Sequence, residues 1–95
     1  MEMAFSGRVI EWRGPAPHLF VPLPEEESDT IEAMKSMLTY GWGVIPVSAQ
    51  IGDTEFTTSL FPKDGVFLLP LKVAVRRAEG IDVGDVVDVT MVLDA

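Results

Sequence analysis

The sequence passes twice through the same order of predicted elements: strand, strand, helix, strand. The first passage covers about residues 3–51 and the second about residues 54–94. The segments before the two helices also resemble each other, since Phe20-Val21-Pro22-Leu23 and Leu68-Leu69-Pro70-Leu71 are both apolar runs interrupted by proline. A chain of 95 residues is too short for two independent cores. The repeat therefore favours an internal duplication within one domain that spans the whole chain.

Alternating apolar residues predict the strands. Residues 3–12 carry apolar side chains in both phases, which predicts one strand that bends near Gly7. Residues 45–51 and 54–60 alternate cleanly, and the Gly52-Asp53 pair between them is typical of a type II′ hairpin. We expect these two strands to be antiparallel neighbours. Further strands are predicted at residues 18–23, 66–71 and 87–93, with a turn at residues 62–65 in which Pro62 forms the first corner.

Two helices are predicted from apolar residues at helical spacing. The first spans about residues 28–40, with Ser28 or Asp29 as its N-terminal cap and Gly41 as its stop. The second is short and is closed by Gly80.

These elements predict a fold that is mainly β with two short helices. If the two halves hide each other's strand edges, they form a six-stranded double-split β-barrel with a helix capping either end. The alternative is that short apolar runs ending in proline recur by chance.

Charge and composition restrict the partners of the chain. Seven Lys and Arg residues against fifteen Asp and Glu residues give a net charge of −8, which disfavours nucleic acid and anionic lipid. The absence of cysteine excludes disulfides and cysteine nucleophiles, and it fits a reducing compartment. The N-terminus lacks the pattern of a signal peptide, and no stretch reaches membrane-spanning length. We expect a cytoplasmic protein with no membrane partner.

A small-molecule groove is one candidate site. Trp12, Trp42 and Arg76 could frame it, because ligand pockets combine apolar walls with a few polar groups. The alternative is that the two tryptophans are core or lid residues.

A positive patch is the second candidate. Lys72 and Arg76 share a helix face and, with Arg77, could receive a phosphate, a carboxylate or nucleic acid. The alternative is that these cations pair with acids such as Glu79.

No catalytic or metal site is predicted. His18 is the only histidine, so a Ser-His-Asp triad or a histidine-rich metal site cannot be assembled in the usual way. Glu25, Glu26, Glu27 and Asp29 form an acidic run, but their spacing fails a calcium loop and suits the positive end of a helix. We therefore predict no catalytic residues, no metal and no cofactor.

Two resemblances follow from the motifs. Residues 69–87 resemble the signature of AbrB-like swapped-hairpin proteins, in which a proline and an arginine-bearing helix precede a glycine and then Gly-Asp-Val. Nearly the whole chain resembles the domain-of-unknown-function family nineteen-oh-five. The motifs that carry this second resemblance are the aromatic N-terminal strand, Phe20-Val21-Pro22-Leu23-Pro24, Ile45-Pro46-Val47, and a helix with Lys72 and Arg76 followed by Gly84-Asp85.

The resemblance implies a double-split β-barrel capped at both ends by short helices. It implies no reaction, because the family has no assigned activity. AbrB-like relatives bind DNA, but their functional residues do not align onto enough basic positions of this chain to be carried over.

We therefore predict a non-enzymatic module that binds an unknown small molecule or protein, because no nucleophile–base pair, metal set or phosphate loop is present in the sequence. One alternative is an AbrB-like DNA-binding regulator that uses Lys72, Arg76 and Arg77. Another is a small hydrolase-type enzyme that uses carboxylates near Arg76. A chain that contains both halves is expected to be a monomer.

Overall fold

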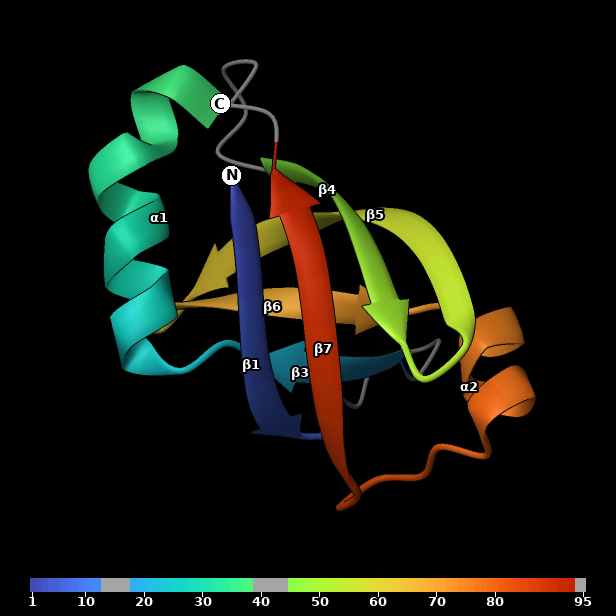
Figure 1. Ribbon diagram of the computed structural model, residues 1–95. Coiled ribbons are helices and arrows are strands. Elements are labelled where there is room, and N and C mark those ends of the chain that lie inside the picture. The colour runs from blue at the N-terminus through green and yellow to red at the C-terminus, as the bar shows by residue number, and fades with distance from the viewer. Residues whose placement is uncertain (13–17, 39–44, 94–95) are drawn as a thin grey trace.

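The computed structural model describes residues 1–12, 18–38 and 45–93, which form a curled antiparallel sheet and two helices (Figure 1). The strands are β1 (Glu2–Arg8), β2 (Ile10–Trp12), β3 (His18–Pro22), β4 (Ile45–Ile51), β5 (Thr54–Lys63), β6 (Val66–Leu71) and β7 (Val86–Leu93), and the helices are α1 (Glu25–Leu38) and α2 (Val73–Glu79). The prediction of a mainly β fold with two helices is confirmed.

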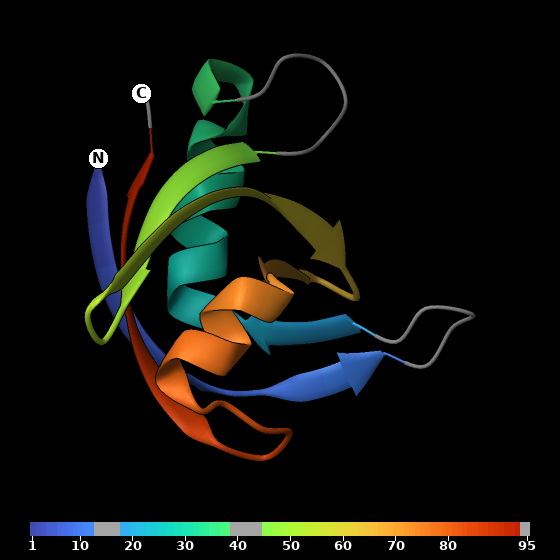
Figure 2. The same ribbon diagram turned by 90° about the vertical axis from the view of Figure 1, so that its right-hand side faces the viewer.

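The sheet has seven strands in the order β1-β7-β4-β5-β6-β3-β2, so the prediction of six strands is wrong. The two strands at the ends of this order, β1 and β2, are consecutive in the chain and are separated only by Val9. The long strand β5 pairs with β4 through its first part and with β6 through its last part. The sheet therefore curls around its own core, with α1 and α2 on opposite sides (Figures 1 and 2).

The seventh strand results from a break in the N-terminal run. The run does bend as predicted, but the interruption lies at Val9 and not at Gly7. Val9 is buried, its N–H donates to the Asp85 carbonyl at 2.8 Å, and its carbonyl accepts from the Gly84 N–H at 2.8 Å. The break is thus held by the loop before β7. Gly7 stays within β1, opposite Val87.

The two halves of the chain pair with each other through their backbones. β3 lies antiparallel to β6, and β4 lies antiparallel to β7. The two similar proline-containing runs are direct neighbours, since Phe20 lies opposite Pro70 and Val21 lies opposite Leu69. The internal duplication and the double-split class of barrel stay predictions.

One alternating set of side chains fills the core. Along β4 and β7, every second residue is buried, as in the predicted two-residue pattern. The other strands add inward residues, and α1 and α2 contribute Ile31 and Val75. The sheet thus encloses one apolar interior and turns its other face outward.

Helix α1 begins three residues earlier than predicted. Glu25, Glu26 and Glu27 form its first turn, where carboxylates are favourable near the positive end of the helix dipole. Ser28, one of the two predicted caps, lies inside the helix and is 2% exposed. The predicted stop at Gly41 lies outside the described residues.

The two hairpin turns are formed by residues with positive φ. Gly52 has φ +57 and Asp53 is not in the positive-φ region, as a type II′ hairpin requires. The next turn is formed by Asp64 and Gly65, with φ values of 52 and 86. Pro62 is not its first corner, because it lies within β5 opposite Phe67.

Helix α2 also ends at a residue with positive φ. Gly80, at φ 63, ends this helix as predicted.

Candidate functional site

An aromatic surface lies on the outer face of β2, β3, β6 and β5. The registers of these strands place Ile10, Trp12, Phe20, Phe61 and Lys63 on the same side, opposite to the core. We call these five residues the Trp12 face. The sequence explains it, because β3 and β6 are apolar in both phases and one phase must point outward.

The rings of the Trp12 face contact one another. The centroid of Trp12 lies 5.9 Å from that of Phe20 and 6.2 Å from that of Phe61. Phe20 and Phe61 meet edge to face at 5.3 Å. Such arrangements are favourable for aromatic quadrupoles. The cluster is therefore a packed unit on the outside of the sheet, separate from the interior core.

The centre of this cluster is accessible. Trp12 is 46% exposed and Ile10 is 39% exposed, although Phe20 beneath them is buried. The Lys63 ammonium lies 3.5 Å from the centroid of the Trp12 ring, in a cation–π contact. An exposed tryptophan with a cation above it combines apolar contact area with a charge, which are the features of residues that dominate protein interfaces.

Arg76 has different surroundings. It lies on α2 and lines a depression of about 340 Å³ with Val73, Arg77, Ile81 and other residues of the helix end. Its Nε atom is buried and has no hydrogen-bond partner among the described residues. Trp12 contacts Phe20, Phe61 and Lys63, and Arg76 is not among these contacts.

The predicted groove of Trp12, Trp42 and Arg76 stays a prediction. Trp42 lies outside the described residues. Trp12 contacts rings on the outer sheet face, and Arg76 lines the depression at α2.

The predicted positive patch lies together on α2. Lys72 is the residue before the helix, and Arg76 and Arg77 are in its last turn. In the described part of the chain, none of them pairs with Glu79; one oxygen of the Glu79 carboxylate accepts a hydrogen bond from the Thr54 hydroxyl at 2.6 Å. Their use by a ligand stays a prediction.

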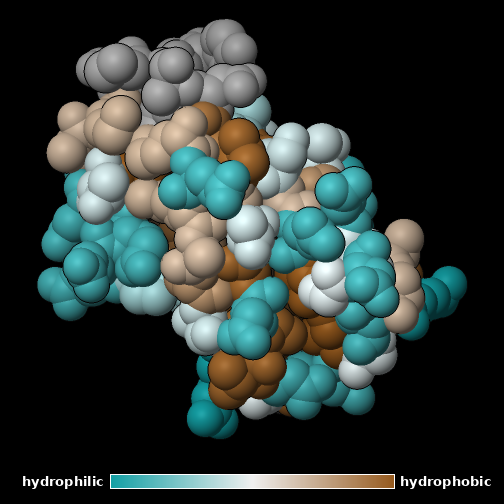
Figure 3. Space-filling model, viewed as in Figure 1, coloured by the Kyte–Doolittle hydropathy of each residue, from teal (hydrophilic) through white to brown (hydrophobic). Residues whose placement is uncertain are grey.

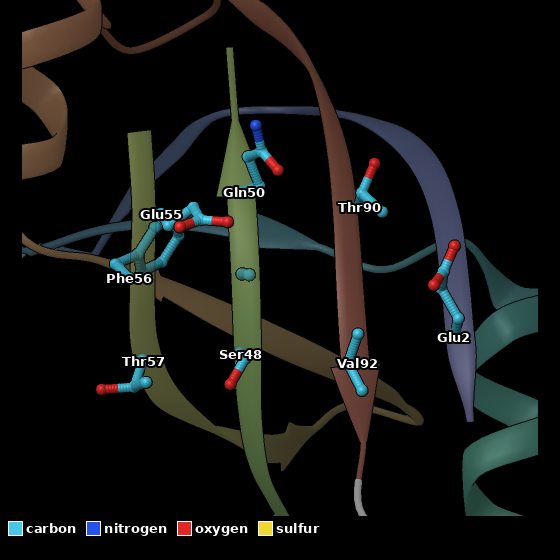
Figure 4. A pocket seen from close by; sticks show the side chains of 9 residues that line it. Glu2, Ser48, Gln50, Glu55, Phe56, Thr57, Thr90 and Val92 are labelled. Atoms are coloured by element: carbon cyan, nitrogen blue, oxygen red, sulfur yellow. The ribbon is translucent and has the colours of Figure 1, made fainter. Parts of the chain in front are cut away.

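A polar depression of about 740 Å³ lies on the outer face of β1, β7, β4 and β5. Figure 4 shows Glu2, Gln50, Glu55 and Thr90 on its separate strands, together with hydroxyl-bearing neighbours. On this side of the molecule, hydrophilic residues are interspersed with apolar ones (Figure 3). This surface was not predicted from the sequence, although the polar residues that alternate with apolar ones in residues 45–60 indicate it. It offers hydrogen bonds but spreads them along an open sheet face.

His18 and Asp85, two side chains that could act as acids or bases, contact an aromatic ring and a backbone N–H group. His18 is exposed, and its ring centroid lies 6.2 Å from that of Phe20. The Asp85 carboxylate accepts a hydrogen bond from the Asp82 N–H at 2.8 Å, within the loop before β7. Across residues 1–12, 18–38 and 45–93, no three His, Asp or Glu side chains are grouped to hold a metal. Neither described helix has the length and apolar character needed to cross a membrane.

Comparison with known proteins gives one family result. The model of a family described as Domain of unknown function (DUF1905) matches residues 5–91, a range that begins in β1 and ends in β7. This match confirms the second resemblance inferred from the motifs, while the relation to AbrB-like proteins stays a prediction. No curated protein matches the chain.

Proposed function

Because the chain belongs to the family described as Domain of unknown function (DUF1905), a description that names no activity, we propose its function from its surfaces. The domain is a non-enzymatic binding module that holds a protein partner on the Trp12 face. The observation that carries this proposal is the half-exposed Trp12 within a packed aromatic cluster, with Lys63 above its ring.

The shape of the surface favours a protein over a small molecule. Small-molecule sites enclose most of their ligand in a concave pocket. The Trp12 face is instead the outer side of a curled sheet, and its residues come from three strands, β2, β3 and β5, with β6 lying between β5 and β3. A broad aromatic surface of this kind suits the core of a protein interface.

The chemistry of the surface describes its partner. Ile10 and Trp12 offer apolar area, and Lys63 offers an ammonium group next to it. The matching surface carries an apolar side chain to pack on Trp12 and a carboxylate to pair with Lys63.

Trp12→Ala tests this proposal by comparative capture. The immobilised wild-type domain and the variant are exposed to the same cell extract, and Val92→Ala serves as the control because Val92 is 44% exposed on β7, opposite Glu2 at the end of β1 that is farther along the chain from Ile10. We expect a partner retained by the wild type and by the control and lost by Trp12→Ala. With the purified partner, the affinity should fall by roughly 30-fold, as at an interface hot spot.

Fluorescence locates the contact. In a Trp42→Phe variant, Trp12 is the single tryptophan, and its emission should shift when the partner binds. Equal capture by Trp12→Ala, or an unchanged Trp12 emission at saturation, contradicts the proposal.

A further inference from the structure

Strand β1 has a free edge. It is the first strand in the sheet order, and β7 is the only strand that pairs with it in the described chain. Met1 and Leu93 exchange both backbone hydrogen bonds at 2.8 Å, and such pairs alternate along an antiparallel ladder. The alternate residues Glu2, Ala4 and Ser6 therefore direct their N–H and C=O groups away from β7. These groups are available to another strand.

Helix α1 forms a second wall beside this edge. Figure 1 shows β1 between β7 and α1. A depression of about 260 Å³ lies between them, lined by Met3, Ala4, Glu26, Glu27 and Thr30. We call it the β1–α1 groove. A strand edge with a helix alongside is a geometry in which an extended peptide adds to a sheet.

The other helix closes the corresponding position in the second half. Glu79 of α2 accepts a hydrogen bond from Thr54, the first residue of β5. No such bond joins Glu26 or Glu27 to β1 in the described residues, and Thr30 donates to the Glu26 carbonyl within its own helix. The β1–α1 groove thus keeps its polar groups for a ligand.

Charge decides which peptide fits. Glu26 and Glu27 line the groove, Glu2 lies at the start of the same strand edge, and the whole chain carries −8. Met3, which is half-buried against the core, supplies the apolar part of the floor. We propose that the β1–α1 groove binds an extended basic peptide segment as an added strand antiparallel or parallel to β1. Alternate side chains of the peptide pack toward Met3, and its Lys or Arg residues face the two glutamates.

The test uses a peptide probe. A short acetylated peptide of alternating lysine and valine, labelled with fluorescein, is titrated with the full chain at low salt, and anisotropy is measured. We expect saturable binding, with amide chemical-shift changes centred on Ala4 and Ser6 in the ¹⁵N-labelled protein. A glutamate–valine peptide, which has the wrong charge, and a lysine–valine peptide N-methylated at every residue, which lacks backbone N–H donors in either strand orientation, should each bind at least roughly 10-fold more weakly.

Two variants of the protein test the two walls. Ala4→Pro removes the outward N–H of the edge without removing a bond to β7, and it should weaken the lysine–valine peptide by at least roughly 10-fold. The double change Glu26→Gln and Glu27→Gln should weaken it by a similar factor, roughly 10-fold. The matched control, Glu25→Gln with Asp29→Asn, removes the same charge from the same helix outside the groove and should change the affinity by less than about 2-fold. Thermal unfolding verifies that each variant is folded.

Several results would overturn the proposal. The first is no binding of the lysine–valine peptide at low salt. The second is a set of amide chemical-shift changes centred on the Trp12 face. The third is an equal loss of peptide affinity in the control variant and in the Glu26–Glu27 variant. If Ala4→Pro does not fold, equal binding of the N-methylated lysine–valine peptide overturns it instead. A dimer in sedimentation that Ala4→Pro dissociates would show a second copy on the edge, against the proposal. Trp12→Ala should leave peptide binding unchanged, so this groove and the Trp12 face succeed or fail separately.

Discussion

Gly7 is the residue at which β1 comes close to the end of β3. A Cβ atom at this position would lie 2.5 Å from Cγ1 of Val21 and 3.0 Å from the carbonyl oxygen of Pro22. The need for glycine here comes from close approach between β1 and the end of β3, because Gly7 has no positive φ. The residue that interrupts the run is Val9, two positions later.

Gly7→Ala is expected to destabilise the fold by about 1–3 kcal/mol, because the added methyl group overpacks a filled contact. Urea unfolding followed by circular dichroism measures this change. Val21→Ala removes the nearer atom, so the double variant should lose less than the sum of the two single variants. Strict additivity of the two losses would show that the close approach to Val21 does not explain Gly7.

Helix α1 takes part in the sheet through Ser28. The Phe67 carbonyl accepts a hydrogen bond from the Leu23 N–H at 2.9 Å, which continues the pairing of β3 with β6. The chain then turns away at Pro24, so no strand residue remains to accept from the Phe67 N–H. The Ser28 hydroxyl accepts that bond at 3.1 Å. A helical side chain therefore replaces the missing strand residue and attaches α1 to β6.

Ser28→Ala should destabilise the protein by about 1–3 kcal/mol, because the buried Phe67 N–H loses its acceptor. The measurement is the free energy of unfolding in urea. Thr30→Ala is the matched control on the same helix, since Thr30 is exposed and bonds only within the helix, and it should change stability by less than about 0.5 kcal/mol. Equal effects of the two changes would show that the bond to β6 contributes nothing specific.

The charge of the whole molecule opposes one of the alternative functions. Lys72, Arg76 and Arg77 cluster at α2, but the chain as a whole carries −8. Binding to DNA depends on neutralising many phosphates, and three cations on a strongly acidic domain supply few such contacts.

We expect no mobility shift of duplex DNA by the full chain at about 50 mM salt, because the long-range repulsion exceeds what three cations offset. A basic DNA-binding protein in the same gel verifies the assay. A shift that weakens steeply with salt, and that disappears when Arg76 and Arg77 are both changed to Ala, would instead establish the DNA-binding alternative.

Local patterns were sufficient for most elements. The alternation in β4 and β7, the glycine that ends α2 and the Gly52 hairpin are each determined by residues next to one another, so they could be predicted. The predicted start of α1 lies three residues after the observed one, because serine is a common helix cap but Ser28 instead accepts a hydrogen bond from the Phe67 N–H. The Trp12 face was only partly anticipated, since Trp12 was selected but its neighbours Phe61 and Lys63 come from a distant strand.

The sequence by itself determined that the chain forms strands with two helices around one core, whereas the internal duplication of its two halves stays a prediction. Only the tertiary structure decided where the N-terminal strand breaks, which apolar phase of β3 and β6 faces outward, and which strands of the described residues lie at the ends of the sheet. The physical reason is that hydrophobic period and turn chemistry act between neighbours in sequence, whereas register, curl and edge exposure arise from pairing between residues far apart in the chain.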